Sequence, residues 1–203
     1  MKKIFLTTVL PLFIILAAVL VTGSGCPAPV TPTLPLPCDT TNSRYMTLYN
    51  AYAGTNFYSF DMQVYEYTFK TNANGNICAI GYQGNSNLTG IAAYKIELID
   101  ATTNAVLYTG TYAFNSTARS YYTIPIVTIA ANQPYILRRT VVNNLGNVSN
   151  TKSHFKQIPS PFAPIVNGPL TIIGTRTYEQ YNQPAPYNIS VNGVLPCIDF
   201  VFN

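Results

Sequence analysis

The chain is poor in charge, has one histidine and contains no tryptophan. Charged residues are 9% of 203 positions. The basic ones are scattered, with Arg138 and Arg139 as their one adjacent pair. Lys2 and Lys3 supply two of the +4 charges, so the chain without them carries only +2. Nucleic-acid binding needs a concentrated basic surface, and we therefore expect no nucleic-acid partner.

Reactive side chains are too few, or too poorly spaced, for the common catalytic and metal sites. His154 lies in a loop-like stretch, and the sequence has no Gly-x-Ser-x-Gly nucleophile elbow. There is no zinc spacing, no Asp-x-Asp-x-Asp calcium loop and no glycine-rich phosphate loop before a helix. We predict that the protein is not an enzyme and has no catalytic residue, metal or cofactor. Calcium held by backbone oxygens stays open.

The first 25 residues are typical of an export signal. Met1–Lys3 is a positive start, Ile4–Val21 is an apolar run, and Thr22–Gly25 supplies small residues before Cys26. We predict a signal peptide over residues 1–25, with its apolar run as a signal helix. A retained membrane anchor is the alternative, because the run is long enough to span a bilayer.

Cys26 has two interpretations. Small residues before a cysteine that follows such a run are similar to the lipobox of bacterial lipoproteins, whose cysteine is acylated. Ser24 and Gly25 fit this pattern, whereas Gly23 stands where an aliphatic residue is usual. We favour lipidation of Cys26 and attachment to a membrane. The alternative is ordinary cleavage, with Cys26 in a disulfide and a fully secreted protein.

Residues 26–38 are predicted to form a tether. Five prolines within Cys26–Pro37 are incompatible with a helix or a central strand. They favour extended polyproline II. Such a segment holds a domain away from a membrane surface, which suits a lipid-anchored N-terminus.

Residues 39–203 are predicted to form one all-β domain. Tyr (16), Pro (15) and Gly (12) are abundant, which favours strands and turns. Tyr65, Tyr67 and Phe69 alternate with polar residues, the period-2 pattern of a half-buried strand. We expect about eight short strands in an antiparallel, jelly-roll-like β-sandwich. We also predict a first short strand at Met46–Tyr49, and an edge strand or a bulge at Pro125.

The sequence also resembles a family of secreted bacterial β-sandwich modules of unknown function. The resemblance covers about residues 65–203 and includes the closing strand found in surface lipoproteins of Bacteroidetes-like bacteria. It lies in the segments Tyr67–Ile77, Ala79–Tyr82, Ile96–Asp100, Ile129–Tyr135 and Leu195–Phe202. Many members carry a tryptophan that this chain lacks. The resemblance implies a sandwich on a surface or secreted protein and brings no catalytic residues.

We predict a Cys38–Cys197 disulfide that joins the start of the domain to its last strand. Cys78 alternates with Ile80 and Tyr82, so we expect it to face the core as a free thiol.

Loop aromatics give the one chemical hint of a ligand. Tyr178, Glu179, Tyr181 and Asn182 form a polar and aromatic patch in the sequence, as sugar-binding sandwiches use. The alternative is that such tyrosines cover the sandwich ends, with the ring buried and the hydroxyl in water; the lack of tryptophan favours this view.

We therefore predict a non-catalytic, exported lipoprotein of the cell envelope or surface, whose sandwich is a binding or adhesion module. Its expected partners are the membrane, through Cys26, and polysaccharide or envelope proteins. One alternative is a structural or assembly subunit of an envelope complex or extracellular fibre. A small glycan-active hydrolase using a pair such as Glu66 and Glu179 is a third hypothesis.

Overall fold

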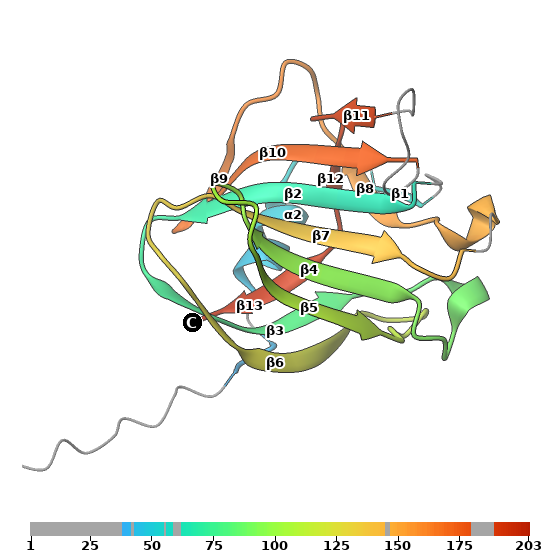
Figure 1. Ribbon diagram of the computed structural model, residues 1–203. Coiled ribbons are helices and arrows are strands. Elements are labelled where there is room, and N and C mark those ends of the chain that lie inside the picture. Colours follow the sequence, from blue (N-terminus) through green and yellow to red (C-terminus); the bar gives the residue numbers. More distant parts are fainter. Residues whose placement is uncertain (1–37, 42, 55, 59–61, 145–146, 180–188) are drawn as a thin grey trace, which may run out of the picture. The chain divides into compact units, whose positions relative to one another are not determined.

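The computed structural model describes residues 38–203 except 42, 55, 59–61, 145–146 and 180–188 (Figure 1). The predicted signal helix, the lipidation at Cys26 and the tether up to residue 37 lie outside these residues. Within the described part, no helix is both long enough and apolar enough to span a membrane.

Antiparallel strands dominate the described residues, and the prediction of an all-β sandwich is confirmed. There are 13 strands in this part of the chain, more than the expected eight, and four of them have only three residues. The strands are β1 (Asn56–Tyr58), β2 (Val64–Thr71), β3 (Gly75–Tyr82), β4 (Tyr94–Asp100), β5 (Val106–Tyr112), β6 (Ser120–Ile129), β7 (Tyr135–Val141), β8 (His154–Gln157), β9 (Ile165–Asn167), β10 (Leu170–Tyr178), β11 (Ile189–Val191), β12 (Val194–Pro196) and β13 (Asp199–Phe202); the helical elements are α2 (Arg44–Ala51), η1 (Ser86–Leu88) and η2 (Val148–Asn150).

The strands form three sheets. The larger sheet has the order β11-β10-β2-β7-β4-β5, with β9 also paired to β10. Two smaller sheets have the orders β13-β3-β6 and β1-β8-β12. In Figure 1 the larger sheet stands in front, with α2, β13 and β3 behind it. One face of the larger sheet therefore packs on the other elements, and we call the opposite face the outer face.

The predicted alternation of β2 is confirmed. Tyr65, Tyr67 and Phe69 are all completely buried on its inner face. The ring of Phe69 stacks on Phe200 of β13, and the ring of Tyr67 stacks on Tyr45 of α2, each with centroids 4.6 Å apart. These contacts tie the larger sheet to the elements behind it.

The first element is a helix, so the expected strand at Met46–Tyr49 was wrong. Ser43 caps α2, because its hydroxyl accepts a hydrogen bond from the amide of Met46 at 3.1 Å. Tyr45, Leu48 and Tyr49 have the i, i+3, i+4 spacing of one helical face, and all three are buried. Burial of this face on the sandwich outweighs the weak helix preference of the segment.

Asn74-Gly75 does not close a hairpin: the chain bends at Asn72 and Ala73, and Gly75 is the first residue of β3. The chain leaves the larger sheet after β2 and enters the β13-β3-β6 sheet at Gly75. A Cβ at Gly75 would lie 2.2 Å from the ring of Phe202, so glycine is needed there for close approach. Pro125 lies in β6, the edge strand of its sheet, as predicted.

Candidate functional site

A row of alternating charges crosses the outer face of the larger sheet. Cross-strand register places Arg176 beside Glu66, Glu66 beside Arg138, and Arg138 beside Glu97. These four residues, the charge row, come from β10, β2, β7 and β4. Adjacent strands are about 4.8 Å apart. Sequence reasoning missed the row because its members are 31 or more positions apart.

The two carboxylates of the charge row lie beneath its cations. Glu66 is 3% exposed and Glu97 is 5% exposed. Arg138 Nε donates to Glu66 Oε2 at 2.6 Å, and Lys95 Nζ lies 2.8 Å from Glu97 Oε1. Buried carboxylates need such partners, because water no longer solvates them. Arg138 thus joins both carboxylates of the row, since its Nη1 also lies 4.0 Å from Glu97 Oε2.

The predicted patch begins at this row. Tyr178, the last residue of β10, is half-buried and donates its hydroxyl to Glu66 Oε1 at 3.1 Å. Burial raises the pKa of Tyr178, against a hydrogen bond from Arg176 that lowers it. Glu179 follows and is exposed, and its carbonyl accepts from the amide of Gln63 at 3.4 Å. Tyr181 and Asn182 lie outside the described residues.

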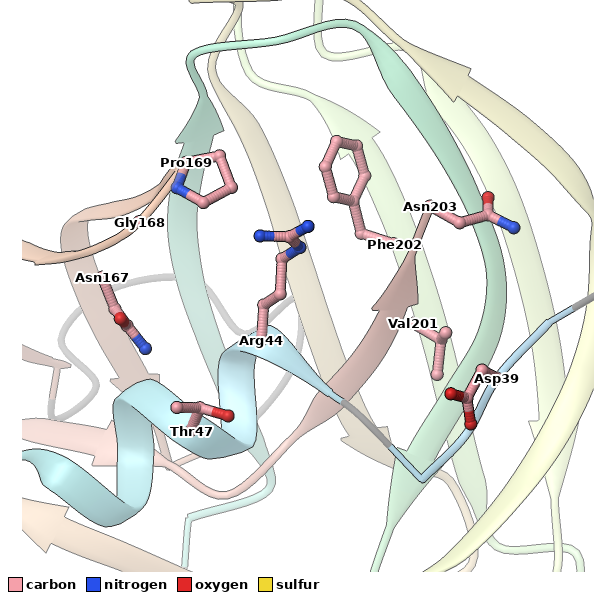
Figure 2. A pocket seen from close by; sticks show the side chains of 9 residues that line it. All are labelled: Asp39, Arg44, Thr47, Asn167, Gly168, Pro169, Val201, Phe202 and Asn203. Atoms are coloured by element: carbon pink, nitrogen blue, oxygen red, sulfur yellow. The ribbon is translucent and has the colours of Figure 1, made fainter. Parts of the chain in front are cut away.

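A pocket of about 370 Å³ lies beside α2 (Figure 2). Four separate segments build it: the chain before α2, the exposed face of α2, the β9–β10 turn and the end of β13. We call this the α2 pocket. It is lined by Asp39, Arg44, Thr47, Asn167, Gly168, Pro169, Val201, Phe202 and Asn203.

The local structure explains how these side chains reach the α2 pocket. Arg44 and Thr47 are three positions apart on the face of α2 opposite its buried side, and both are exposed. Gly168 has a φ of +56°, a left-handed conformation that allows β9 to turn tightly into β10. In Figure 2 the guanidinium of Arg44 lies between Pro169 and Phe202.

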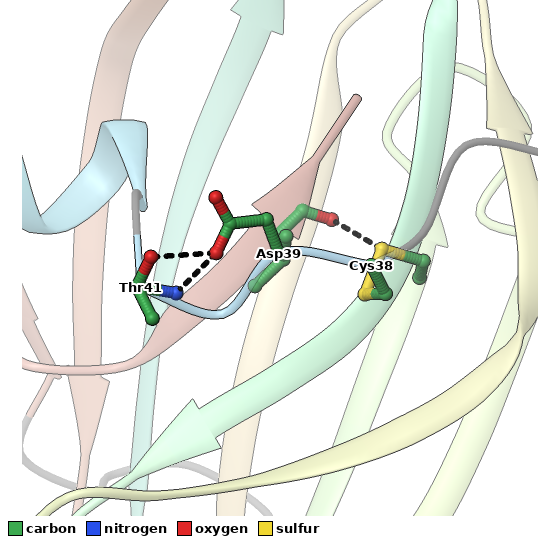
Figure 3. Close-up of a disulfide and its surroundings, with 5 residues drawn as sticks. Cys38, Asp39 and Thr41 are labelled. Carbon is green, nitrogen blue, oxygen red and sulfur yellow. Dashed lines mark hydrogen bonds between the residues drawn. A yellow bond between two sulfur atoms is a disulfide. The ribbon is translucent and has the colours of Figure 1, made fainter.

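Asp39 supplies a negative charge at the edge of the α2 pocket. Its Oδ1 accepts hydrogen bonds from the amide of Thr41 at 2.9 Å and from the Thr41 hydroxyl at 2.6 Å. These bonds, the hydroxyl one first, lower the pKa of Asp39, so it is ionised at neutral pH. Figure 3 shows this turn directly after Cys38.

Cys38 is bonded to Cys78, so the predicted Cys38–Cys197 disulfide was wrong. The error lies in the assumed alternation of β3. Val201 pairs with Ala79 while Phe202 pairs with Ile77, which makes Cys78 the extra residue of a bulge. A bulge reverses the side-chain alternation. Cys78 and Ala79 consequently pack away from the main core, where Cys38 reaches them.

Cys197 is a free, buried thiol in a polar cluster. Arg119 Nη2 donates to its sulfur at 2.6 Å. Burial raises the pKa of Cys197, although Arg119 opposes the shift. A thiol that keeps its proton is a weak nucleophile, so this geometry does not favour a reactive cysteine.

Asp199 lies in the same cluster. It accepts hydrogen bonds from the hydroxyls of Ser43 and Tyr121, the second at 2.6 Å. Burial raises the pKa of Asp199 despite these bonds. The contacts join α2, β6 and β13, which is a structural role. Among the described residues, no three His, Cys, Asp or Glu side chains gather as a metal site would require.

Comparison with known proteins gives no relative to guide the assignment. No protein-family model matches the chain, and no curated protein matches it either. The resemblance to secreted β-sandwich modules therefore stays a prediction, and the function has to be argued from the geometry.

Proposed function

We propose that the chain is a non-catalytic, exported surface lipoprotein whose β-sandwich binds glycan in the α2 pocket. One observation carries this proposal: the α2 pocket combines the ring of Phe202 with a carboxylate, a guanidinium, an amide and a hydroxyl. These are the groups of Asp39, Arg44, Asn167 and Thr47.

A sugar has two kinds of surface, and the α2 pocket offers a partner for each. The C–H face of a pyranose ring is apolar and packs on an aromatic ring such as Phe202. Its hydroxyls donate to carboxylates and accept from guanidinium and amide groups. Small-molecule sites usually measure about 300–1,000 Å³, so a pocket of about 370 Å³ suits a single sugar residue at a chain end.

The disulfide supports export. Disulfides form and persist in oxidising compartments outside the cytosol, and Cys38–Cys78 is one. Its first cysteine, Cys38, is the last residue of the proposed tether of residues 26–38. Lipid on Cys26 would attach the tether to a membrane and leave the sandwich free to bind polysaccharide.

Glycan-array binding with the full chain, purified in mild detergent, tests this proposal. We expect binding that is lost in a Thr47→Ala/Asn167→Ala variant, which removes two hydrogen-bonding groups of the pocket. Arg176→Gln, on the charge row, is the matched surface control and should bind like the wild type. Loss of binding in Tyr178→Ala/Tyr181→Ala, with the pocket variant unaffected, would move the site to the patch predicted from the sequence.

A structural or assembly subunit is the second candidate function. Exposed apolar side chains on the outer strands favour it: Val106 and Leu107 on β5 are 52% and 41% exposed, and Val191 on β11 is 57% exposed. Both strands are at ends of the larger sheet, where unpaired strand edges can join other chains. Sedimentation and cross-linking test it, and a strictly monomeric protein without an envelope partner would count against it.

The hydrolase hypothesis receives less support from the geometry. Glu66 is held by Arg138 and Tyr178 rather than left open to a substrate. Glycan hydrolysis by the full chain that disappears in Glu66→Gln would revive it.

A further inference from the structure

Arg44 differs in its surroundings from Arg138 and Lys95 on the larger sheet. Arg138 is paired with Glu66, and Lys95 with Glu97. Arg44 is exposed in the α2 pocket. Its guanidinium makes no hydrogen bond or ion pair with any residue that the structure describes. The positive charge of Arg44 is therefore available to a ligand.

Asp39 does not neutralise this charge, although it lines the same pocket. No ion pair joins it to Arg44 in the described part of the chain. The Thr41 amide and hydroxyl both bond Asp39 Oδ1, and the disulfide of Cys38 fixes the start of this segment. Two opposite charges are thus held in one pocket without meeting each other.

The positive end of α2 does not compete for the same ligand group. Ser43 caps the helix through the amide of Met46. Its hydroxyl in turn donates to the buried carboxyl group of Asp199. The cap and its partner Asp199 lie on the buried side of the helix start, and among the described residues that line the α2 pocket Arg44 is the one cation.

We infer that the α2 pocket takes an acidic sugar of the uronic-acid class at the end of a glycan. This rests on the proposed glycan-binding function and names its ligand. The carboxylate of the sugar binds Arg44, whose planar guanidinium can donate two parallel hydrogen bonds to it. The sugar hydroxyls donate to Asp39 and contact Asn167, and the ring packs on Phe202.

The expected selectivity follows from the charge of Arg44. Hydrogen bonds between charged partners are stronger than those between neutral groups. A neutral sugar has no carboxylate to bind the guanidinium of Arg44, which then stays hydrated. We therefore expect the acid to bind about tenfold or more tightly than a neutral sugar of the same shape.

Calorimetric titration of the full chain in mild detergent tests this inference with three probes. They are methyl glucuronide, its uncharged amide and methyl glucoside. We expect the acid to bind at least about tenfold more tightly than the other two. Arg44→Gln should remove this preference, and Arg44→Lys should retain part of it. Arg176→Gln, which removes an exposed charge elsewhere, should keep the full preference.

The outcomes separate the inference from the function on which it rests. If all three probes bind equally well, the acidic ligand is refuted and glycan binding stands. If none binds, and the glycan array is also negative, both are refuted. An acid preference that survives in Arg44→Gln would overturn the role of Arg44, provided that thermal unfolding shows the variant to be folded.

Discussion

Removal of the Cys38–Cys78 disulfide should destabilise the sandwich strongly. The two cysteines are 40 positions apart. Closing a loop of that length in the unfolded chain corresponds to about 4 kcal/mol in the chain-entropy model. Cys78 also packs with Ala79 and Val201 outside the main core, and this contact is loosened when the cross-link is lost.

The assay is urea unfolding of the oxidised chain beside a Cys38→Ser/Cys78→Ser variant. The free energy of unfolding falls by about 2 kcal/mol per molar urea. A loss of about 4 kcal/mol should therefore lower the urea midpoint of the variant by about 2 M. Reducing the wild type with dithiothreitol should give the same shift. A loss below about 1 kcal/mol would refute the entropic reasoning.

Cys197→Ser is the matched control, since it removes a buried cysteine that has no disulfide. It should keep the Cys38–Cys78 bond on non-reducing peptide mapping. If Cys197→Ser abolished the disulfide instead, the Cys38–Cys197 pairing predicted from the sequence would be right. The explanation of the Cys38–Cys78 bond by the bulge at Cys78 would then fail.

Three further predictions concern buried ionisable groups. Burial and Arg119 lower the pKa of His154 below its ordinary 6.5. Its imidazole signals should therefore titrate below pH 6.5 in NMR, and a midpoint above 6.5 would contradict this. Burial raises the pKa of Asp199 above 3.8. The protonated carboxyl group therefore stabilises the fold fully below about pH 3.8, and this contribution is lost as the pH rises through the pKa of Asp199 in the folded state. Asp199→Asn should gain stability relative to the wild type as the pH rises above about 4 in urea unfolding, whereas parallel pH profiles would refute it. A double-mutant cycle with Glu66→Gln and Arg138→Met should give a coupling of about 1–2 kcal/mol, reduced by the partial exposure of Arg138; a value near zero would show that the pair is not coupled.

Local alternation was the part of the fold that the sequence could predict. The inner faces of β2 and β4 follow from period-2 patterns because burial of Tyr65, Tyr67 and Ile96 dominates their local energetics. The edge position of Pro125 follows from its missing amide proton.

Features that depend on tertiary packing could not be predicted in this way. The bulge at Cys78 depends on its pairing with β13, which is more than 100 positions away. The helix α2 depends on a surface that buries Tyr45 and Leu48.

The candidate site was the least predictable part. The α2 pocket joins Asp39 and Arg44 to Asn167 and Phe202, and no local pattern relates segments so far apart. The aromatic patch at Tyr178 was visible in the sequence because its residues are neighbours. The hydrogen bond from Tyr178 to Glu66, which ties it to the charge row, was not visible.

A crystal structure of the full chain with a uronic-acid-terminated oligosaccharide tests the central claim most directly. We predict that the terminal sugar lies in the α2 pocket, with its ring on Phe202 and its carboxylate on Arg44. Sugar bound instead on the charge row beside Tyr178, or an α2 pocket that stays empty at saturating oligosaccharide, would contradict the account.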